Sequence, residues 1–156
     1  MSISPNDTLL PSDDKRAWRS WALYDWANSA FATTVMAGFF PLFFKAYWAN
    51  PNNPSESTYI LGLSNSIGSI VVAALAPFLG AIADKAGAKK KFLALFAFLG
   101  IVMTGGLWMV QQGQWLMAVL VYALAAIGFS SSNLFYDSLL PAIARREKVD
   151  YVSALG

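Results

Sequence analysis

Polar side chains recur at helical spacing inside a long apolar segment near the N-terminus of this chain. In residues 19–47, the polar residues Asp25, Asn28, Ser29 and Thr33 stand three or four positions apart or side by side. On an α-helix these four side chains fall within about 140° of the circumference. Carboxylate and amide groups are costly in an apolar environment, so they are expected to face a partner or a water-filled path.

A second apolar segment, residues 115–141, repeats this pattern. Its polar residues Ser130, Asn133 and Asp137 are three and four positions apart. They fall within about 60° of a helix circumference. Together the two segments predict a path for a small polar solute or ion. The residues predicted to line this path are Asp25, Asn28, Asn65, Asn133 and Asp137.

The two acids also have a structural interpretation. Each lies near a segment end that carries cations, so Asp25 could pair with Arg19, and Asp137 with Arg145 or Arg146. An acid close to the membrane boundary is less costly than one at the bilayer centre, because headgroups and water are within reach. The sequence leaves both alternatives open, a solute path and a structural ion pair.

Asn65 shares one helix face with a row of small residues in the segment 57–83. Small residues let helices approach closely in lipid, so we expect this face to pack against another helix. An amide in hydrocarbon needs a partner, and Asn65 therefore either bonds a neighbouring helix or lines a cavity. The other members of this face are Gly62, Ser66, Ser69, Ala73, Ala76 and Gly80.

Enzymatic chemistry is not indicated by these residues. Two carboxylates can act as acid and base in principle, but no nucleophile-elbow, zinc-binding or Walker motif accompanies them. The chain has no Cys and no His, which removes thiolate chemistry and imidazole proton relays. We therefore expect no enzymatic activity, no cofactor and no metal site.

The elements that must position the polar residues follow from hydropathy. The chain is 56% hydrophobic and 13% charged, too apolar to hide its side chains in one soluble core. A helix of about 20 apolar residues crosses a bilayer core of roughly 30 Å. Four such segments predict an all-α integral membrane protein with four transmembrane helices, and tight turns predict that the last three pack as antiparallel neighbours. The predicted spans are 19–47, 57–83, 92–110 and 115–141.

The charges predict how these helices are oriented. All of the 11 Lys and Arg residues except Lys45 flank the same ends of the four spans. Cytoplasmic loops collect Lys and Arg, so both termini and the loop between the second and third spans should be cytoplasmic, in a plasma or inner membrane. The net charge of +2 therefore reflects the cations of the predicted cytoplasmic loops. It predicts a lipid bilayer as the partner and no nucleic acid.

The turn between the second and third predicted spans combines glycines, an acid and lysines. Gly87 can adopt a positive φ and so reverse the chain within a few residues, and Asp84 places an anion where the second span ends. A solvated basic loop accounts for the lysines but does not explain the spacing of the acid and the two glycines, Gly80 and Gly87.

This turn, Gly-x-x-x-Asp-Lys-x-Gly-x-Lys-Lys over residues 80–90, resembles the loop between helices 2 and 3 of the major facilitator superfamily. Two further segments are similar to the vacuolar-effluxer-like family within that superfamily. One runs from Trp21 to Phe31 and contains Tyr-Asp-Trp-Ala-Asn-Ser; the other is Phe-Tyr-Asp-Ser-Leu-Leu-Pro at 135–141. The resemblance covers essentially the whole chain.

The resemblance implies a secondary active transporter with twelve helices in two halves, working by alternating access. This chain would supply helices 1–4 of the N-terminal half, and the missing C-terminal helices of the same polypeptide would be its partners. Fungal relatives are associated with amino acid export from the vacuole, so a small polar solute, such as an amino acid, is the implied substrate. By the same resemblance, Asp84 would lie at the contact between the two halves, and its turn would have a gating role. The predicted gating residues are Gly80, Asp84, Lys85, Gly87, Lys89 and Lys90.

We accordingly expect three regions: a cytoplasmic N-terminal tail at 1–17, a four-helix transmembrane region at 18–142, and a cytoplasmic segment at 143–156 that leads to a missing fifth helix. The alternative is a non-transporting four-helix membrane scaffold or oligomeric subunit. Such a protein would bury the polar faces of its first and fourth spans in a stable oligomer. The substrate, the coupling ion and the direction of transport cannot be read from the sequence.

Overall fold

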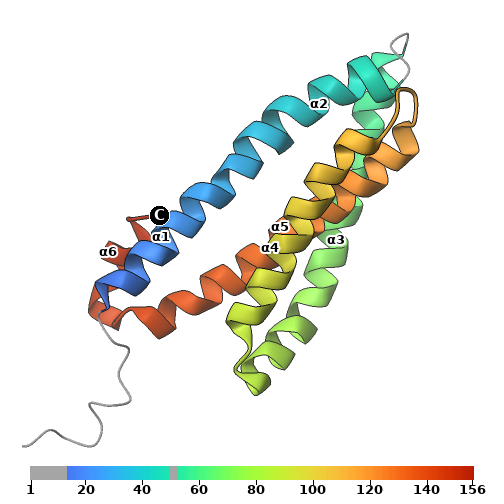
Figure 1. The fold of residues 1–156 in the computed structure, drawn as a ribbon. Helices are drawn as coiled ribbons and strands as arrows, with labels where there is room; N and C mark the ends of the chain where they lie inside the picture. The colour runs from blue at the N-terminus through green and yellow to red at the C-terminus, as the bar shows by residue number, and fades with distance from the viewer. Residues whose placement is uncertain (1–13, 50–52) are drawn as a thin grey trace, which may run out of the picture.

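The fold is known from a computed structural model that describes residues 14–49 and 53–156. Most of the predicted N-terminal tail, residues 1–13, therefore lies outside the described residues. The described residues form helices, turns and bends without a β-strand. Four helical rods are long and apolar enough to cross a membrane (Figure 1). The prediction of an all-α membrane protein with four spans is confirmed.

The first span is a single rod, Lys15–Trp48, that changes its helical winding along its length. Asp14 caps its start by accepting a hydrogen bond from the backbone N–H of Arg16 at 2.8 Å, which satisfies one of the free donors of the first turn. Pro41 lacks a backbone N–H and lies just after the longer π-helical stretch. The segments are α1 (Lys15–Ala30), the π-helix η2 (Phe31–Phe39), α2 (Phe40–Phe43) and the π-helix η3 (Phe44–Trp48).

The other three spans are regular α-helices joined by short turns. Gly87, with φ 59°, and Gly113, with φ 80°, lie in these turns, where a left-handed backbone lets the chain reverse. The helices are α3 (Pro54–Ala86), α4 (Lys89–Gly106), extended by the 3₁₀ turn η4 (Leu107–Met109), and α5 (Trp115–Ile143). A 3₁₀ turn η5 (Arg146–Lys148) and the short helix α6 (Val149–Ser153) follow.

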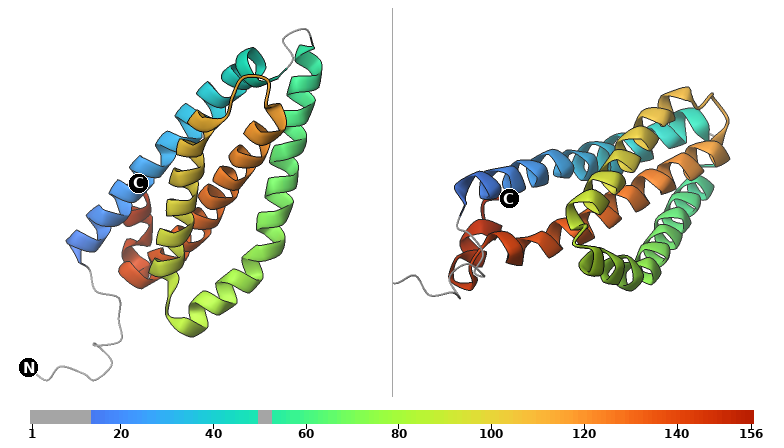
Figure 2. Two further views of the ribbon diagram at one scale, coloured as in Figure 1. Left: turned by 45° about the vertical axis from the view of Figure 1, so that its right-hand side comes forward. Right: turned by 60° about the horizontal axis from the view of Figure 1, so that its bottom comes forward.

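Helix α5 is the centre of the bundle. It packs along α4 and also against α3, whereas α3 and α4 make few contacts with each other (Figure 2). The expectation that the second and third spans pack as close neighbours was therefore wrong. A short turn holds the ends of two helices together but does not hold their axes parallel, and each helix packs on the surface that it fits best.

Gly128 of α5 lets that helix come close to α4. A Cβ atom added to Gly128 would lie 2.7 Å from the backbone nitrogen of Gly100 and 2.8 Å from the carbonyl oxygen of Phe96. No side chain fits in that space. In lipid there is no hydrophobic force between helices, so van der Waals packing at such a close backbone contact is a main source of helix association.

The first span contacts the bundle near both of its ends, and in between Asn28 and Phe31 contact α5. At the outer end, where α5 begins, Phe40 stacks on Tyr122 with ring centroids 3.7 Å apart, and the Trp48 indole donates to the Val110 carbonyl. At the inner end, where α5 finishes, the Trp18 indole donates to the Ile143 carbonyl at 2.8 Å. Each buried indole N–H thus has a partner, and between these contacts the first span stands away from α4.

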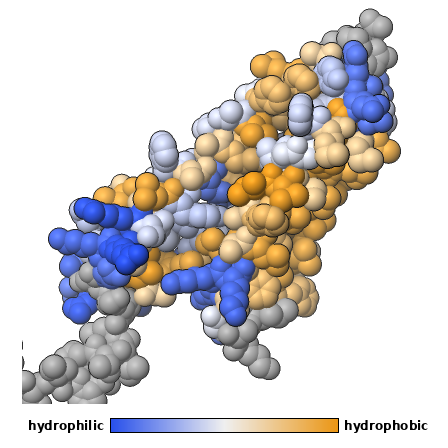
Figure 3. Space-filling view, viewed as in Figure 1, coloured by the Kyte–Doolittle hydropathy of each residue, from blue (hydrophilic) through white to orange (hydrophobic). Residues whose placement is uncertain are grey.

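The outside of the bundle is apolar over most of its length. Large side chains such as Trp26, Phe78 and Ile101 are exposed, and Figure 3 shows hydrophobic residues along the helices with hydrophilic ones mostly towards the ends. Apolar surface of this extent is unfavourable in water and is typical of contact with hydrocarbon. The chain is therefore a multi-pass membrane protein.

Candidate functional site

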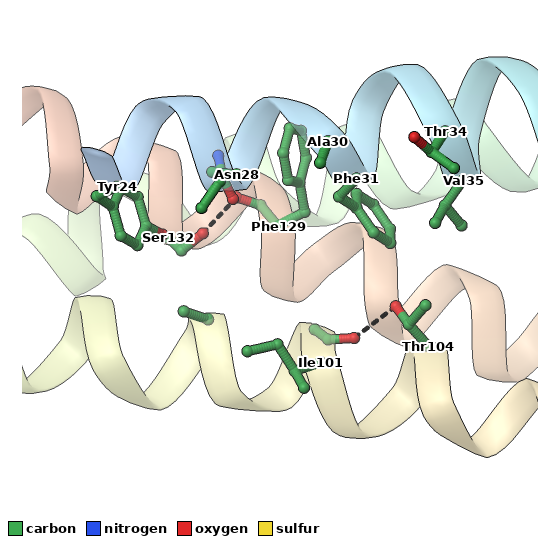
Figure 4. A pocket seen from close by; sticks show the side chains of 13 residues that line it. Tyr24, Asn28, Ala30, Phe31, Thr34, Val35, Ile101, Thr104, Phe129 and Ser132 are labelled. Carbon is green, nitrogen blue, oxygen red and sulfur yellow. Dashed lines mark hydrogen bonds between the residues drawn. The ribbon is translucent and has the colours of Figure 1, made fainter. Parts of the chain in front are cut away.

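A pocket of about 560 Å³ lies where the first span separates from α4 and α5. We call it the inter-span pocket, and Figure 4 shows its side chains converging from the three helices. Its volume is within the range of small-molecule sites, roughly 300–1,000 Å³. The first span contributes residues between Tyr24 and Val35, α4 contributes residues between Ala97 and Thr104, and α5 contributes Phe129 and Ser132.

The wall of this pocket is mainly apolar and carries no charge on the described residues that line it. Phe31 and Phe129 face each other with ring centroids 5.0 Å apart. The hydroxyl of Thr104 donates to the Gly100 carbonyl at 2.7 Å, and that of Ser132 donates to the Phe129 carbonyl at 2.8 Å. Each hydroxyl donates its hydrogen to a carbonyl of its own helix, so each hydroxyl oxygen can still accept a hydrogen bond from a ligand.

One side-chain hydrogen bond joins the first span to α5 at the inner side of the pocket. The amide nitrogen of Asn28 donates to the amide oxygen of Asn133 at 2.5 Å. The structure thus brings together two residues that the sequence assigned to one path. Asn28 also lines the pocket, and its amide has a partner in a region where an unpaired amide is costly.

Both predicted acids lie one helical turn further inward, in a group that we call the acidic end: Tyr24, Asp25, Tyr136 and Asp137. Asp25 precedes Asn28 by three positions, and Asp137 follows Asn133 by four, so each acid shares a helix face with its asparagine. The carboxylates are close enough to interact electrostatically. Among the described residues, Asp25 forms no ion pair with Arg19, and Asp137 forms none with Arg146.

Aromatic rings pack tightly at the acidic end. Tyr136 lies between Trp21 and Tyr24, with ring centroids 4.3 Å and 5.2 Å away. Its side chain is 5% exposed, and its hydroxyl has no hydrogen-bond partner among the described residues. A buried hydroxyl in this state costs free energy, and Gly156 lies next to it, since a Cβ on that glycine would be 3.1 Å from the hydroxyl oxygen.

Asn65 lies apart from this site. Its side chain is exposed on α3 and interacts with the Tyr122 hydroxyl of α5, away from the inter-span pocket. Of its two alternatives, the bond to a neighbouring helix fits this position. The small residues on the same face are not packed as expected, since a Cβ on Gly62 or Gly80 would meet nothing within 4 Å.

The predicted gating residues lie at the inner end of α3 and α4, in and beside the turn that joins them. Lys89 and Asp84 form an ion pair of 2.6 Å across this turn, with side chains 31% and 64% exposed. Gly87 has the positive φ that the sequence predicted. Lys90 is exposed, and the side chain of Lys85 lies outside the described part of the chain.

Sequence reasoning missed several residues that build this site. Gly128, which packs on Gly100, allows the short distance between α4 and α5, but single glycines in apolar segments have no distinctive spacing. The two tyrosines of the acidic end did have a signal: Tyr24 and Tyr136 each directly precede an acid, so the dipeptide Tyr-Asp occurs once in each polar segment.

Comparison with known proteins finds a matching family model and similar proteins. A family model described as "Vacuole effluxer Atg22 like" matches residues 46–153. The chain is 41% identical over 138 residues to an uncharacterized MFS-type transporter, YxiO, of Bacillus subtilis (strain 168). It is 31% identical over 137 residues to an uncharacterized protein of Aquifex aeolicus (strain VF5). Each match covers 88% of this chain but only 32% or 33% of the relative. No solved structure matches this chain.

Proposed function

Since this chain belongs to the vacuole effluxer Atg22-like family, we propose that it forms part of a secondary active transporter of the major facilitator type. The chain spans about a third of the length of the curated relatives that it matches. Transport is therefore proposed for the full-length polypeptide, in which the four spans work with further helices. The partners are the lipid bilayer and a small solute.

The observation that carries this proposal is the inter-span pocket with the Asn28–Asn133 bond at its inner side. A hollow between helices that make few contacts along their length can change shape when one helix tilts. The interhelical amide bond is weak enough to break, since such bonds in membranes average about 0.6 kcal/mol. A solute with a polar group can replace one amide and so open the contact.

We assign the inner end of the bundle, with Lys15, Ile143 and the Gly87 turn, to the cytoplasm. Lys and Arg gather at this end, as expected for cytoplasmic loops. The membrane is a plasma or inner membrane. The polar path comprises Asp25, Asn28, Asn133 and Asp137, and amino acids are the first solutes to test because the resemblance of the sequence implies a small polar solute.

We assign the turn between α3 and α4 a gating role. The Asp84–Lys89 ion pair is largely exposed, and exposed pairs contribute roughly 0–1 kcal/mol. Such a contact can form and break during each transport cycle. The positive φ of Gly87 fixes the direction in which the turn reverses, so the two charged residues are held opposite each other.

Flux into proteoliposomes tests the proposed function. Full-length protein is reconstituted and screened with labelled amino acids and other small solutes, in parallel with Asn28→Leu and Ser66→Ala variants. Asn28→Leu should lose most of the flux. Ser66→Ala should keep it, because that hydroxyl only bonds the Gly62 carbonyl of its own helix. No solute-dependent flux from any solute, or equal flux in both variants, contradicts the proposal.

A further inference from the structure

The chain that follows α5 turns back and contacts the first span, with α6 beside α1 (Figure 1). We call this stretch, residues 144–156, the returning segment. The indole of Trp18 donates to the carbonyl of Ile143, where α5 ends, at 2.8 Å. The same indole meets the ring of Tyr151 edge-on, with centroids 6.2 Å apart, and has the Lys148 ammonium 5.5 Å from its ring centre. One aromatic side chain of the first span therefore contacts both the end of α5 and the returning segment.

The returning segment is held in place by a small apolar face. Val152 is fully buried, in a cluster with Trp18, Trp21 and Tyr136, and Val149 packs against the same cluster. The two valines are three positions apart and so share one face of α6. This helix has five residues, and isolated helices shorter than ~12 residues are marginal in water. The helical form of α6 therefore depends on its contact with the cluster.

The last part of the returning segment lies over the acidic end. A Cβ on Gly156 would be 3.1 Å from the Tyr136 hydroxyl oxygen of α5 and 3.2 Å from the Cβ of Asp25 on the first span. It would also be 3.0 Å from the ring of Trp21. The segment thus bridges the first span and α5 on the inner side of the polar path. A solute that passes between the acidic end and the inner face of the membrane would meet it.

The two ends of the first span are held differently. At the outer end, Phe40, Phe44 and Trp48 are at most 2% exposed and belong to a cluster that includes residues of α5. At the inner end, Trp18 and Trp21 are 7% and 9% exposed, and part of what covers them is α6. An element that is unstable alone can leave its contact more readily than a packed span. The inner end is therefore the end that can open.

We propose that the returning segment is a latch, which closes the inner end of the path while Val152 is docked and opens it when Val152 leaves the cluster and the first span tilts away from α5. The proposal rests on the proposed transport function, because a solute path gives the closure its purpose. One buried valine, one hydrogen bond and one cation–π contact are each weak enough to break. Residues 145–148 are exposed, so docking buries little of their charge.

Thiol labelling tests whether the segment covers the acidic end. The full-length protein carries Asp25→Cys as its single cysteine, with any cysteine elsewhere replaced by serine, and reacts with N-ethylmaleimide in nanodiscs. Adding Val152→Asp places a charge in a fully buried position and should speed labelling at least ~10-fold, because the segment is released. Ser153→Asp places the same charge at an exposed neighbour and should leave the rate unchanged. Equal rates in the two variants overturn the latch.

Two further variants keep this test decisive. Val152→Ala is milder and should raise the labelling rate in the same direction, which covers the case in which Val152→Asp does not fold. Ala118→Cys is a second reporter, fully buried in the outer cluster, and its labelling should stay slow when Val152 is replaced. An equal rise at both reporters would mean general unfolding and would contradict the latch.

Reversible cross-linking tests whether the latch must open during transport. The rings of Trp18 and Tyr151 are in contact, so cysteines in their places can be joined by a short bis-methanethiosulfonate. Flux of labelled amino acids and the other screened solutes into proteoliposomes should fall on linking and return with dithiothreitol. Arg146→Cys with Asp150→Cys is the control, because both positions are exposed and lie within the segment, and its linked form should keep its flux. Equal flux in the linked and reduced Trp18–Tyr151 variant contradicts the latch.

Labelling and flux separate the two proposals. Faster labelling in Val152→Asp alone, without flux of any solute in the wild type, would leave the latch standing as a cover and contradict the proposed transport function. Flux that survives the link between positions 18 and 151 would do the reverse.

Discussion

At the residue scale, the contact between Asn28 and Asn133 links the first span to α5. Each amide has its partner on the other helix, and each lies in a segment that is otherwise apolar. Each amide therefore depends on the other for its hydrogen bond. Removing one amide leaves the other unsatisfied, whereas removing both leaves an apolar contact. This asymmetry is general for buried hydrogen bonds.

A double-mutant cycle measures this coupling. Asn133→Leu should lower the free energy of unfolding by about 1–2 kcal/mol, because the Asn28 amide loses its partner. Adding Asn28→Leu should recover part of that loss. The measurement is thermal unfolding of the purified protein in detergent for the wild type, both single variants and the double variant. Strictly additive losses would show that the two amides do not interact.

At the element scale, the close approach of α4 and α5 has a different origin. It depends on the absence of a side chain at Gly128, where a Cβ would lie within 2.8 Å of two backbone atoms of α4. Backbone atoms cannot move away from an added Cβ as the end of a flexible side chain can. The inner turn between α3 and α4 depends instead on the backbone angles of Gly87 and on an exposed ion pair.

Gly128→Ala should destabilise the bundle by roughly 1–3 kcal/mol, the usual cost of overpacking a close contact. Gly105→Ala is the matched control, because a Cβ there would meet nothing within 4 Å. Thermal unfolding in detergent should show a lower midpoint for the first variant and an unchanged or higher one for the second. Equal unfolding midpoints for the two variants would mean that a Cβ at position 128 is accommodated without a loss of stability.

Asp84→Asn should reduce transport by the full-length protein while membrane insertion and the unfolding midpoint stay as in the wild type. The ion pair with Lys89 is exposed and contributes little stability, so an effect on flux would report gating. The exchanged pair Asp84→Lys with Lys89→Asp should restore part of the flux. Unchanged flux in Asp84→Asn would exclude a gating role for this carboxylate.

At the scale of the whole molecule, the four spans form an incomplete surface. The small-residue face of α3, with Gly62 and Gly80, is open in the described residues, and the chain covers about a third of its curated relatives. Further helices of a full-length polypeptide can cover such a face, since small residues let helix backbones come close. Orientation is the whole-molecule property that can be tested at once.

Single cysteines can test the proposed topology because the chain has no Cys of its own. A membrane-impermeant thiol reagent applied to intact cells should label Gln112→Cys, in the outer turn, and should label Ser153→Cys only after permeabilisation. Both positions are exposed. The opposite labelling pattern would show that the cation bias does not set the orientation.

The existence of four spans could be read from the sequence, as could the reversal at Gly87. Hydropathy along one segment and the φ of one glycine are local properties, so neighbours in space do not change them. The two aligned polar faces indicated that Asn28 and Asn133 belong to one path, but nothing in the sequence said that these two amides would bond each other or that Asp25 would form no ion pair with Arg19 among the described residues.

The sequence by itself therefore determined the spans, the polar faces of the first and last of them, and the predicted side of each loop. Only the tertiary structure decided that α3 packs on α5 instead of α4, that Gly100 meets Gly128, and that the first span stands away from α4 to leave a pocket. The physical reason is that these features depend on which surfaces fit together. Without a hydrophobic force between helices in lipid, that choice is made by the shape of the contact, and shape appears only when the helices are assembled.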